Sequence, residues 1–267
     1  MSAGDSAWFL AFSRFGLGAR PGSRMLSGDP REALLSELAT PGGARLEGAA
    51  LSGTPQILQA VYADELRRKM ERGRADAAKV AALGMPAPNV AALIFPNPTD
   101  APAMAPNAAA PPGSTTPMMT PEPPPEQKFF RADAQARLEQ ACAAPIGFLE
   151  RLVAFWSNHF CVSAAKSAIG RAAAGAFERE AIRPYVLGRF AGMLRAVEQH
   201  PAMLNFLDNA QSVGPNSKAG QNRKVGLNEN LAREILELHT MGVGSGYGQA
   251  DVAALARIVT GWTIAGR

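Results

Sequence analysis

Two of the three histidines, His159 and His239, are the residues in this sequence best suited to chemistry. Placing successive residues about 100° apart puts each imidazole on the apolar side of a predicted helix. A buried imidazole needs a hydrogen-bond partner or must give up its charge. If the two helices pack together, the pair would meet a carboxylate such as Glu234, Asp208 or Asp251, which suits a metal site or an acid-base pair. The alternative, more common for a histidine on an apolar face, is that each imidazole donates to a backbone carbonyl.

The stretch around His239 reads GLNENLAREILELHTMG over residues 226–242. Asn228 is a suitable N-cap, and Glu229 lies favourably in the positive field of a helix start. Gly242 suits the C-terminal stop. The pattern predicts one helix over about 229–241.

The predicted helix has a compact polar stripe that admits two interpretations. The apolar centre of this helix consists of Leu231, Ile235 and Leu238. Its polar stripe consists of Asn230, Arg233, Glu234 and Glu237. Glu234 and Glu237, three residues apart, could bind a metal or share a proton, with Arg233 as an anion clamp. The alternative is a solvated face on which Glu229 and Arg233 form an i, i+4 ion pair. His200, before Pro201 at a helix end, is interpreted as a C-terminal cap.

These patterns define the candidate site. The candidate catalytic residues are His159, Glu234, Glu237 and His239. The candidate binding residues are Asn158, Asp208, Asn228, Glu229, Asn230, Arg233 and Asp251. A further hypothesis treats the Lys- and Arg-bearing loop at 211–225 as a lid over Asn228 and Glu229. No cofactor and no metal are assigned.

The elements around these residues are predicted to be helical. The segment PIGFLERLVAFWSNHF places a broad apolar face opposite Glu150, Arg151 and Asn158; its members are Phe148, Leu149, Leu152, Val153, Phe155, Trp156 and Phe160. A second apolar face precedes His200, formed by Val186, Leu187, Phe190, Leu194 and Val197. No alternating strand pattern of convincing length occurs. The fold class expected is therefore all-α, an irregular multi-helix bundle with a long Pro/Ala-rich insertion.

A proline-rich segment divides the chain into three parts. Residues 84–127 hold 13 of the 21 prolines, and such density prevents continuous regular structure. We expect N-terminal helices over 1–83, a low-complexity linker or insertion over 84–127, and a helical core over 128–267.

Charge and composition narrow the functional classes. The net charge is +4, but Lys and Arg are interspersed with Asp and Glu along most of the chain. The densest basic cluster, at 67–74, lacks an aromatic residue for base stacking, so nucleic-acid binding is not expected. No apolar run reaches the roughly 18 to 20 residues of a transmembrane helix, and no signal peptide is visible. The chain as written reads as soluble and cytoplasmic, with export as the alternative. Cys161 follows an apolar stretch and is expected to be a buried free thiol.

Six sequence words resemble one bacterial family, domain of unknown function 1800. In order, they are RFGLGARP, LVAFWSNHF, IRPYVLGRFAGML, HPAMLNFLDNAQS, GLNENLAREILELHTMGV and YGQADVAALARIVTGWT. The run from 146 to 264 is the specific part of the resemblance. The resemblance implies an all-helical protein with no established activity. The family domain runs well past the TGWT word, so further helices are expected downstream.

The resemblance also implies a partner. Members of the family often accompany a sulfatase-like, commonly exported family, domain of unknown function 1501. The first functional hypothesis is therefore a helical scaffold or partner-binding protein working with that family. The alternative is a metal-assisted or acid-base hydrolase acting on an extracellular polymer, with its site around His159, Glu234 and His239.

Overall fold

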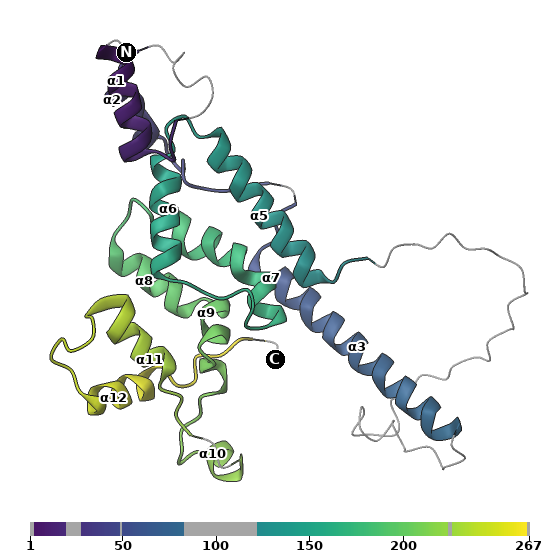
Figure 1. The fold of residues 1–267 in the computed structure, drawn as a ribbon. Coiled ribbons are helices and arrows are strands. Elements are labelled where there is room, and N and C mark those ends of the chain that lie inside the picture. The colour runs from purple at the N-terminus through teal and green to yellow at the C-terminus, as the bar shows by residue number, and fades with distance from the viewer. Residues whose placement is uncertain (1–2, 20–27, 49, 83–121, 224–225, 266–267) are drawn as a thin grey trace, which may run out of the picture. The chain divides into compact units, whose positions relative to one another are not determined.

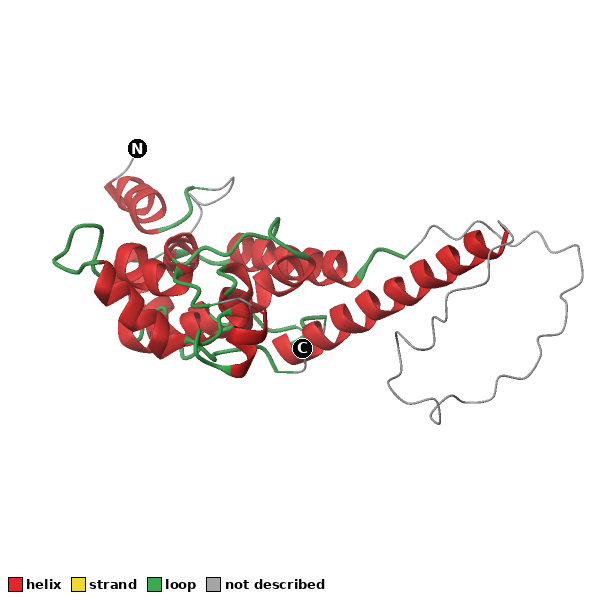
Figure 2. Ribbon diagram, turned by 90° about the horizontal axis from the view of Figure 1, so that it is seen from below, coloured by secondary structure: helices red, strands yellow, loops and turns green. Residues whose placement is uncertain are grey.

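A computed structural model describes residues 3–19, 28–48, 50–82, 122–223 and 226–265. These described residues form helices, turns and irregular segments, with no strand among them (Figure 2). The expected all-α class is confirmed. Most of the proline-rich segment, residues 83–121, lies outside the described residues.

The chain divides into two compact units, one formed by 1–59 with 125–267 and the other by 60–124. The elements of the larger unit before the insertion are α1 (Ala3–Leu10), the π-helix η1 (Ala11–Phe15), α2 (Pro30–Ala39) and the first residues of α3 (Thr54–Ala82). Those after it are α5 (Pro125–Ala143), α6 (Phe148–His159), α7 (Ala168–Phe177), η3 (Glu178–Ile182), η4 (Arg183–Tyr185), α8 (Phe190–Gln199), α9 (Pro201–Phe206), η5 (Asn209–Gln211), α10 (Lys218–Arg223), α11 (Asn230–Glu234), η6 (Ile235–Thr240) and α12 (Gln249–Val259). The elements η3 and η6 are π-helical, and η4 and η5 are 3₁₀-helical.

The centre of the larger unit is α7, which packs against α5 and α9 (Figure 1). Its sequence AIGRAAAGAF is rich in small residues, which lets neighbouring backbones approach closely. At Gly175 an added Cβ would lie 2.1 Å from the Cβ of Asp133 on α5, so only glycine fits there. Ala172, Ala173 and Ala176 are fully buried in this contact region.

The start of α6 is held by a carboxylate from α2. The Oε2 atom of Glu37 accepts hydrogen bonds from the backbone amides of Ile146 (3.2 Å) and Gly147 (3.0 Å), and Oε1 accepts one from Leu149 (3.1 Å). A carboxylate at this place satisfies amides that have no partner within the helix and complements the helix dipole. This contact fixes the first turn of α6, the helix that ends at His159.

A buried arginine links α6 to the turn after α7. Arg183 donates two hydrogen bonds to Glu150, at 2.8 and 2.9 Å, and one to Glu178, at 2.9 Å. It also donates to the carbonyl oxygen of Ala44 at 2.9 Å. The Arg183 side chain is fully buried. Burial alone would lower the pKa of Arg183, but the hydrogen bonds and charges of the two glutamates raise it above its ordinary value.

The buried face of α6 differs from the sequence expectation. Glu150 was predicted to lie opposite the core but is buried, and Phe155 was predicted to face the core but is 60% exposed. The apolar arc of this helix is wider than the face it buries, and Val153 lies at the centre of that buried face. The helical wheel could not predict which residue lies at the centre of the buried face, because the burial of Glu150 depends on its ion pair with Arg183.

Two further expectations were wrong. Leu238 was placed at the apolar centre of its helix but is 60% exposed, because the helix changes to π-type hydrogen bonding at Ile235. A π-turn rotates the later side chains away from the positions of a 100° wheel. Cys161, expected to be buried, is exposed. The helix end predicted at Gly242 is confirmed, because Gly242 follows the C-cap residue and has a left-handed φ of 89°.

The smaller unit contains the greater part of α3, residues 60–82. Within it Asp64 is buried and forms ion pairs with Arg67 and Arg68 one turn later. Of the described helices, none combines the length and the apolar character that a bilayer crossing requires.

Replacing Arg183 with Met is expected to lower the free energy of unfolding by about 3–5 kcal/mol, because two carboxylates would stay buried without a cation. Urea unfolding measures the change. The matched control is Arg189→Met, since Arg189 is exposed and should change stability by about 0.5 kcal/mol or less. Equal effects of the two substitutions would contradict the role given to Arg183.

Candidate functional site

The polar centre of the candidate site is a buried pair formed by His239 and Glu198. The Nδ1 atom of His239 lies 2.7 Å from Oε1 of Glu198, and both side chains are 5% exposed. His239 lies in the π-helix η6 and Glu198 in the last turn of α8. The second carboxylate oxygen, Oε2 of Glu198, is buried and has no hydrogen-bond partner among the described residues. A buried oxygen in this state is an unsatisfied acceptor that calls for an explanation.

His159 lies next to this pair at the end of α6. Its Nε2 atom is 3.3 Å from the backbone oxygen of His239, and the two imidazole centroids are 6.1 Å apart. The rings of Phe160 and Trp156 contact His159, at centroid distances of 4.5 and 5.6 Å. The ring of Phe160 also contacts His239 at 5.1 Å. The two histidines therefore meet inside an aromatic cluster.

The hydrogen bonds fix which ring nitrogen carries the proton in each neutral imidazole. A backbone oxygen can only accept, so Nε2 of His159 donates and its Nδ1 keeps a lone pair. With Glu198 ionised, Nδ1 of His239 donates and its Nε2 keeps a lone pair. One nitrogen held by a carboxylate or carbonyl, with the other free, is the arrangement of a metal-ligating or general-base histidine.

The remaining groups do not complete a metal centre. Among the described residues no three His, Cys, Asp or Glu side chains are grouped so that they could hold one ion. His159 and His239 are brought together, as the sequence hypothesis required, but their carboxylate partner is Glu198 rather than Glu234, Asp208 or Asp251. The catalytic role assigned to the two histidines stays a prediction.

The polar stripe of α11 and η6 forms an ion-pair network. Arg233 donates to Glu237 at 3.0 Å and to Glu229 at 3.3 Å, four residues away on either side. It also donates to Gln249 of α12 at 3.0 Å. Glu234, the last residue of α11, shares no hydrogen bond with either histidine among the described residues. The predicted i, i+4 pair is present, and Arg233 joins α11 to α12.

Asn228 ties the start of α11 to the end of α9. Its Oδ1 accepts from the amide of Asn230 at 2.9 Å, and its Nδ2 donates to the carbonyls of Leu207 and Asp208, each at 3.2 Å. The helix begins one residue later than predicted, at Asn230, so Glu229 rather than Asn228 occupies the N-cap position. The Asn228 side chain still accepts the amide hydrogen of the first helical residue. Every polar atom of the Asn228 side chain has a structural role.

The other predicted binding residues are dispersed. Asp208 adopts a left-handed φ of 57° and pairs with Lys166 at 2.7 Å. Asp251 accepts from the amide of Gly248 at 2.9 Å and caps α12. Asn158 is exposed on α6. The structure does not gather these side chains around one ligand.

Sequence reasoning missed Glu198, although a signal was present. Glu198 lies eight residues after Phe190 and four after Leu194, so the helical wheel puts it on the apolar stripe of α8. A carboxylate on such a stripe predicts a buried partner. Arg183 was missed for a different reason: it lies in a π-to-3₁₀ transition, where no regular wheel applies.

His200 is the C-cap of α8, as predicted, and it also caps the start of α9. Its Nδ1 accepts from the amide of Ala202 at 3.1 Å and so caps the N-terminus of α9. Its Nε2 lies 3.1 Å from Oγ1 of Thr54 and 3.3 Å from Oε2 of Glu180. Because Nδ1 accepts a backbone N–H, Nε2 must carry the proton in the neutral ring. In that form Nε2 cannot take a proton from Thr54, which excludes a Thr-His-Glu nucleophile arrangement.

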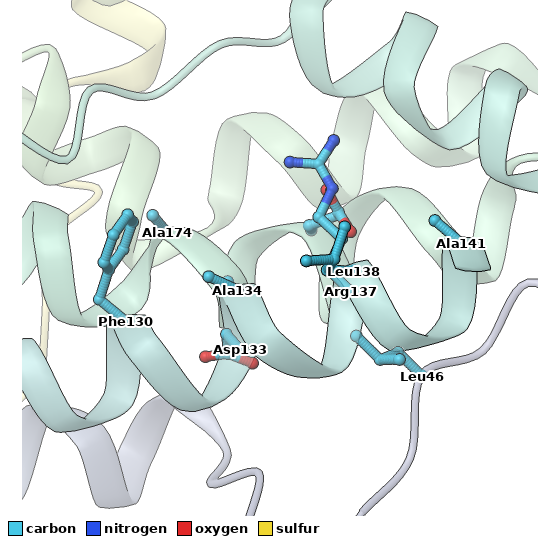
Figure 3. A pocket seen from close by; sticks show the side chains of 10 residues that line it. Leu46, Phe130, Asp133, Ala134, Arg137, Leu138, Ala141 and Ala174 are labelled. Carbon is cyan, nitrogen blue, oxygen red and sulfur yellow. The ribbon is translucent and has the colours of Figure 1, made fainter. Parts of the chain in front are cut away.

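A pocket of about 380 Å³ is lined by residues of α5 and α7, and by none of the three histidines (Figure 3). Its apolar wall comes from Phe130, Leu138 and Leu46. At its polar wall Asp133 pairs with Arg179 at 2.7 Å. Burial raises the pKa of Asp133, in spite of the hydrogen bond from Arg179, which lowers it. No predicted site residue lines this pocket.

The hydrogen bonds predict which tautomer each histidine adopts. Nitrogen-detected NMR of the imidazole rings near neutral pH should show Nε2 protonated in His159 and His200 and Nδ1 protonated in His239. Glu198→Gln should change the His239 signals and leave those of His200 unchanged. An Nε2-protonated His239 in the unsubstituted protein would contradict the donor role given to Nδ1.

The environment of Glu180 predicts an acid-sensitive contribution to stability. Burial raises the pKa of Glu180, but hydrogen bonds from His200 and Thr54 outweigh it and hold the pKa below its ordinary value of 4.5. A lowered folded-state pKa gives stability that is present above the unfolded pKa and is lost as pH falls through the folded pKa. The free energy of unfolding, measured with urea, should therefore fall more steeply between pH 6 and pH 3 for the unsubstituted protein than for Glu180→Gln. Parallel curves would refute the assignment.

Comparison with known proteins gives one family. The family model described as "Protein of unknown function (DUF1800)" matches residues 10–267. No curated protein and no solved structure matches the chain. The match covers most of the chain, including the helices that carry both histidine groups, and agrees with the resemblance found in the sequence words. The chain belongs to the DUF1800 family.

Proposed function

We propose that this chain is a helical partner-binding scaffold. The observation that carries the proposal is a group of apolar side chains on α6, on α8 and in the turn before α8, which we call the aromatic face: Phe155, Trp156, Leu187 and Phe190. Trp156 is half-buried and the other three are exposed. Phe155, Leu187 and Phe190 are 60%, 54% and 41% exposed. Contiguous exposed apolar side chains of this size are typical of interaction sites.

Ring contacts join the three aromatic side chains of this face. The ring of Trp156 lies 5.0 Å from that of Phe155 on the same helix and 5.7 Å from that of Phe190 on α8. Beneath it, Phe160 is fully buried and lies 6.1 Å from Phe190. Aromatic side chains held in this way are preorganised, so binding would cost little side-chain entropy.

The polar groups below the face favour scaffolding over catalysis. Glu198 and His239 are buried beneath the rings and occupied with each other, and Arg233 neutralises Glu237. Among the described pockets, none is lined by His159 or His239. A scaffold needs only a stable buried pair, whereas an enzyme needs substrate access to the imidazole.

The first partner to test is the sulfatase-like, commonly exported family that the family resemblance implies. An exported partner would place this chain in an exported pathway. Support for this choice comes from the resemblance, and the aromatic face supplies a surface on which such a partner could dock.

The double substitution Phe155→Ser with Leu187→Ser is expected to weaken binding to the sulfatase-like partner at least tenfold, because it removes two exposed anchors. Isothermal titration calorimetry with the purified partner measures the affinity. Leu66→Ser is the matched control, since Leu66 is 57% exposed but lies on α3. Equal affinity of the double variant and the unsubstituted chain would contradict the docking role of the aromatic face.

A second function, acid-base hydrolysis, is favoured by one specific observation. In the Glu198–His239 pair, Oε2 of Glu198 has no hydrogen-bond partner among the described residues and Nε2 of His239 keeps a lone pair. Both atoms could therefore accept a further proton or hydrogen bond. If the chain opens there, His239 could act as a general base.

His239→Asn and Glu198→Gln separate the two functions. A hydrolase should lose about 10²–10⁴-fold in turnover of nitrophenyl ester, phosphate, sulfate or glycoside substrates, in variants that stay folded by circular dichroism. The scaffold proposal expects no such turnover in the unsubstituted protein and a loss of stability only. Specific turnover that disappears with both substitutions would replace the scaffold proposal with the hydrolase.

A further inference from the structure

His200 joins three elements of the larger unit through its two ring nitrogens. Nδ1 accepts the backbone N–H of Ala202 at 3.1 Å, in the first turn of α9. Nε2 lies 3.1 Å from Oγ1 of Thr54, the first residue of α3, and 3.3 Å from Oε2 of Glu180 on η3. The ring is 6% exposed and packs edge-on against the ring of Phe177, at a centroid distance of 5.3 Å. Both nitrogens of this buried imidazole are therefore in use.

The hydrogen bond from Ala202 excludes a proton from Nδ1. An imidazole nitrogen has one lone pair, and at Nδ1 that lone pair accepts a backbone hydrogen. The next two amides of α9, those of Met203 and Leu204, donate to the backbone oxygen of His200 instead. Ala202 is fully buried, so its amide cannot turn to water if the ring withdraws. Protonation of Nδ1 and the cap of α9 are thus mutually exclusive.

The carboxylate at the other nitrogen favours the protonated ring. With a neutral imidazole, the contact between Nε2 and Oε2 of Glu180 is a long hydrogen bond, and with an imidazolium it becomes an ion pair. Burial raises the pKa of Glu180, but hydrogen bonds from His200 and Thr54 hold that pKa below its ordinary value of 4.5. Glu180 is therefore ionised throughout the range in which a histidine titrates. A proton on His200 removes a helix cap and creates an ion pair.

The other charged side chains on the surrounding elements have partners of their own or lie away from the ring. On η3, Glu178 pairs with Arg183 and Arg179 pairs with Asp133, and on α8, Glu198 pairs with His239. Arg195 of α8 is exposed, and Arg171 of α7 lies six residues before Phe177, about 120° from it around the helix. Residues 54–63 and α9 carry no charged side chain. Glu180 is therefore the charge that acts on His200.

The other two histidines lack this coupling. Nε2 of His159 contacts a backbone oxygen and Nδ1 of His239 contacts Glu198, which leaves the second nitrogen of each ring with a lone pair. Each ring can take a proton on that nitrogen without giving up a hydrogen bond. In His200, by contrast, proton binding is coupled to the capping of a helix.

We propose that His200 is a pH-sensitive switch, in which a proton on Nδ1 releases the amide of Ala202 and exchanges the cap of α9 for an ion pair with Glu180. Histidine is the side chain whose charge changes between about pH 5 and pH 8, so the switch operates in that range. The uncapped state binds one more proton than the capped state, so lowering the pH favours the uncapped state. The first turn of α9, which packs against α7 at the centre of the larger unit, loosens on acidification.

NMR of the full chain between about pH 8 and pH 5 follows the ring and the amide together. Nδ1 of His200 should gain a proton, and over the same pH range the exchange protection of the Ala202 amide, corrected for intrinsic exchange, should fall about tenfold or more. A protonated Nδ1 with an undiminished Ala202 protection overturns the switch, and so does an Nδ1 that stays unprotonated throughout. Equal loss of protection at Val153, which is fully buried on α6, would show global unfolding and would also overturn it.

Two variants separate the parts of the switch. His200→Asn keeps an oxygen acceptor at the N-cap, where Asn is favoured, but cannot titrate, so its Ala202 protection should vary less than about twofold over the same range. An equal loss in this variant would assign the effect to another group and refute the role of His200. Glu180→Gln removes the anion, so protonation of Nδ1 and loss of the cap should move together to lower pH, while His159 and His239 titrate as before. An unmoved His200 midpoint in Glu180→Gln would refute the ion-paired state.

Discussion

The structure depends on the requirement that a buried carboxylate have a partner. Glu150, Glu178 and Glu198 all lie in the interior of the larger unit. Arg183 pairs with Glu150 and Glu178, and His239 pairs with Glu198. Two of these pairs join elements distant in sequence: Arg183 with Glu150 joins the turn after α7 to α6, and His239 with Glu198 joins η6 to α8. Breaking such a pair leaves an uncompensated charge, which costs more than the pair contributes when intact.

This constraint also shapes the surface. On both α6 and α8 a buried carboxylate accompanies an exposed aromatic side chain. Phe155 is exposed on the helix that buries Glu150, and Phe190 is exposed on the helix that buries Glu198. The buried carboxylates of α6 and α8 thus occupy interior positions, while Phe155 and Phe190 remain on the surface proposed to bind a partner.

Much of the fold could be predicted from local sequence, and the pairing could not. Periodicity predicted the helices, and residue type predicted the cap at Asn228 and the stop at Gly242, because those effects act within one turn. Leu238 was misplaced because π-helical hydrogen bonding changes the rotation per residue, and the backbone chooses that geometry only in its tertiary context. The partner of His239 lies 41 residues away in sequence, and local patterns carry no information about such a contact. The helical wheel did contain Glu198 on an apolar stripe, so its burial was predictable even though its partner was not.

Hydroxyl-radical footprinting of the chain with its partner bound tests the central claim most directly. The account predicts that Phe155, Trp156 and Phe190 become protected from oxidation in the complex, whereas Phe130, which is exposed on α5, stays as reactive as in the free chain. A bound partner that leaves those three rings fully reactive would contradict the claim that the aromatic face is where this protein binds.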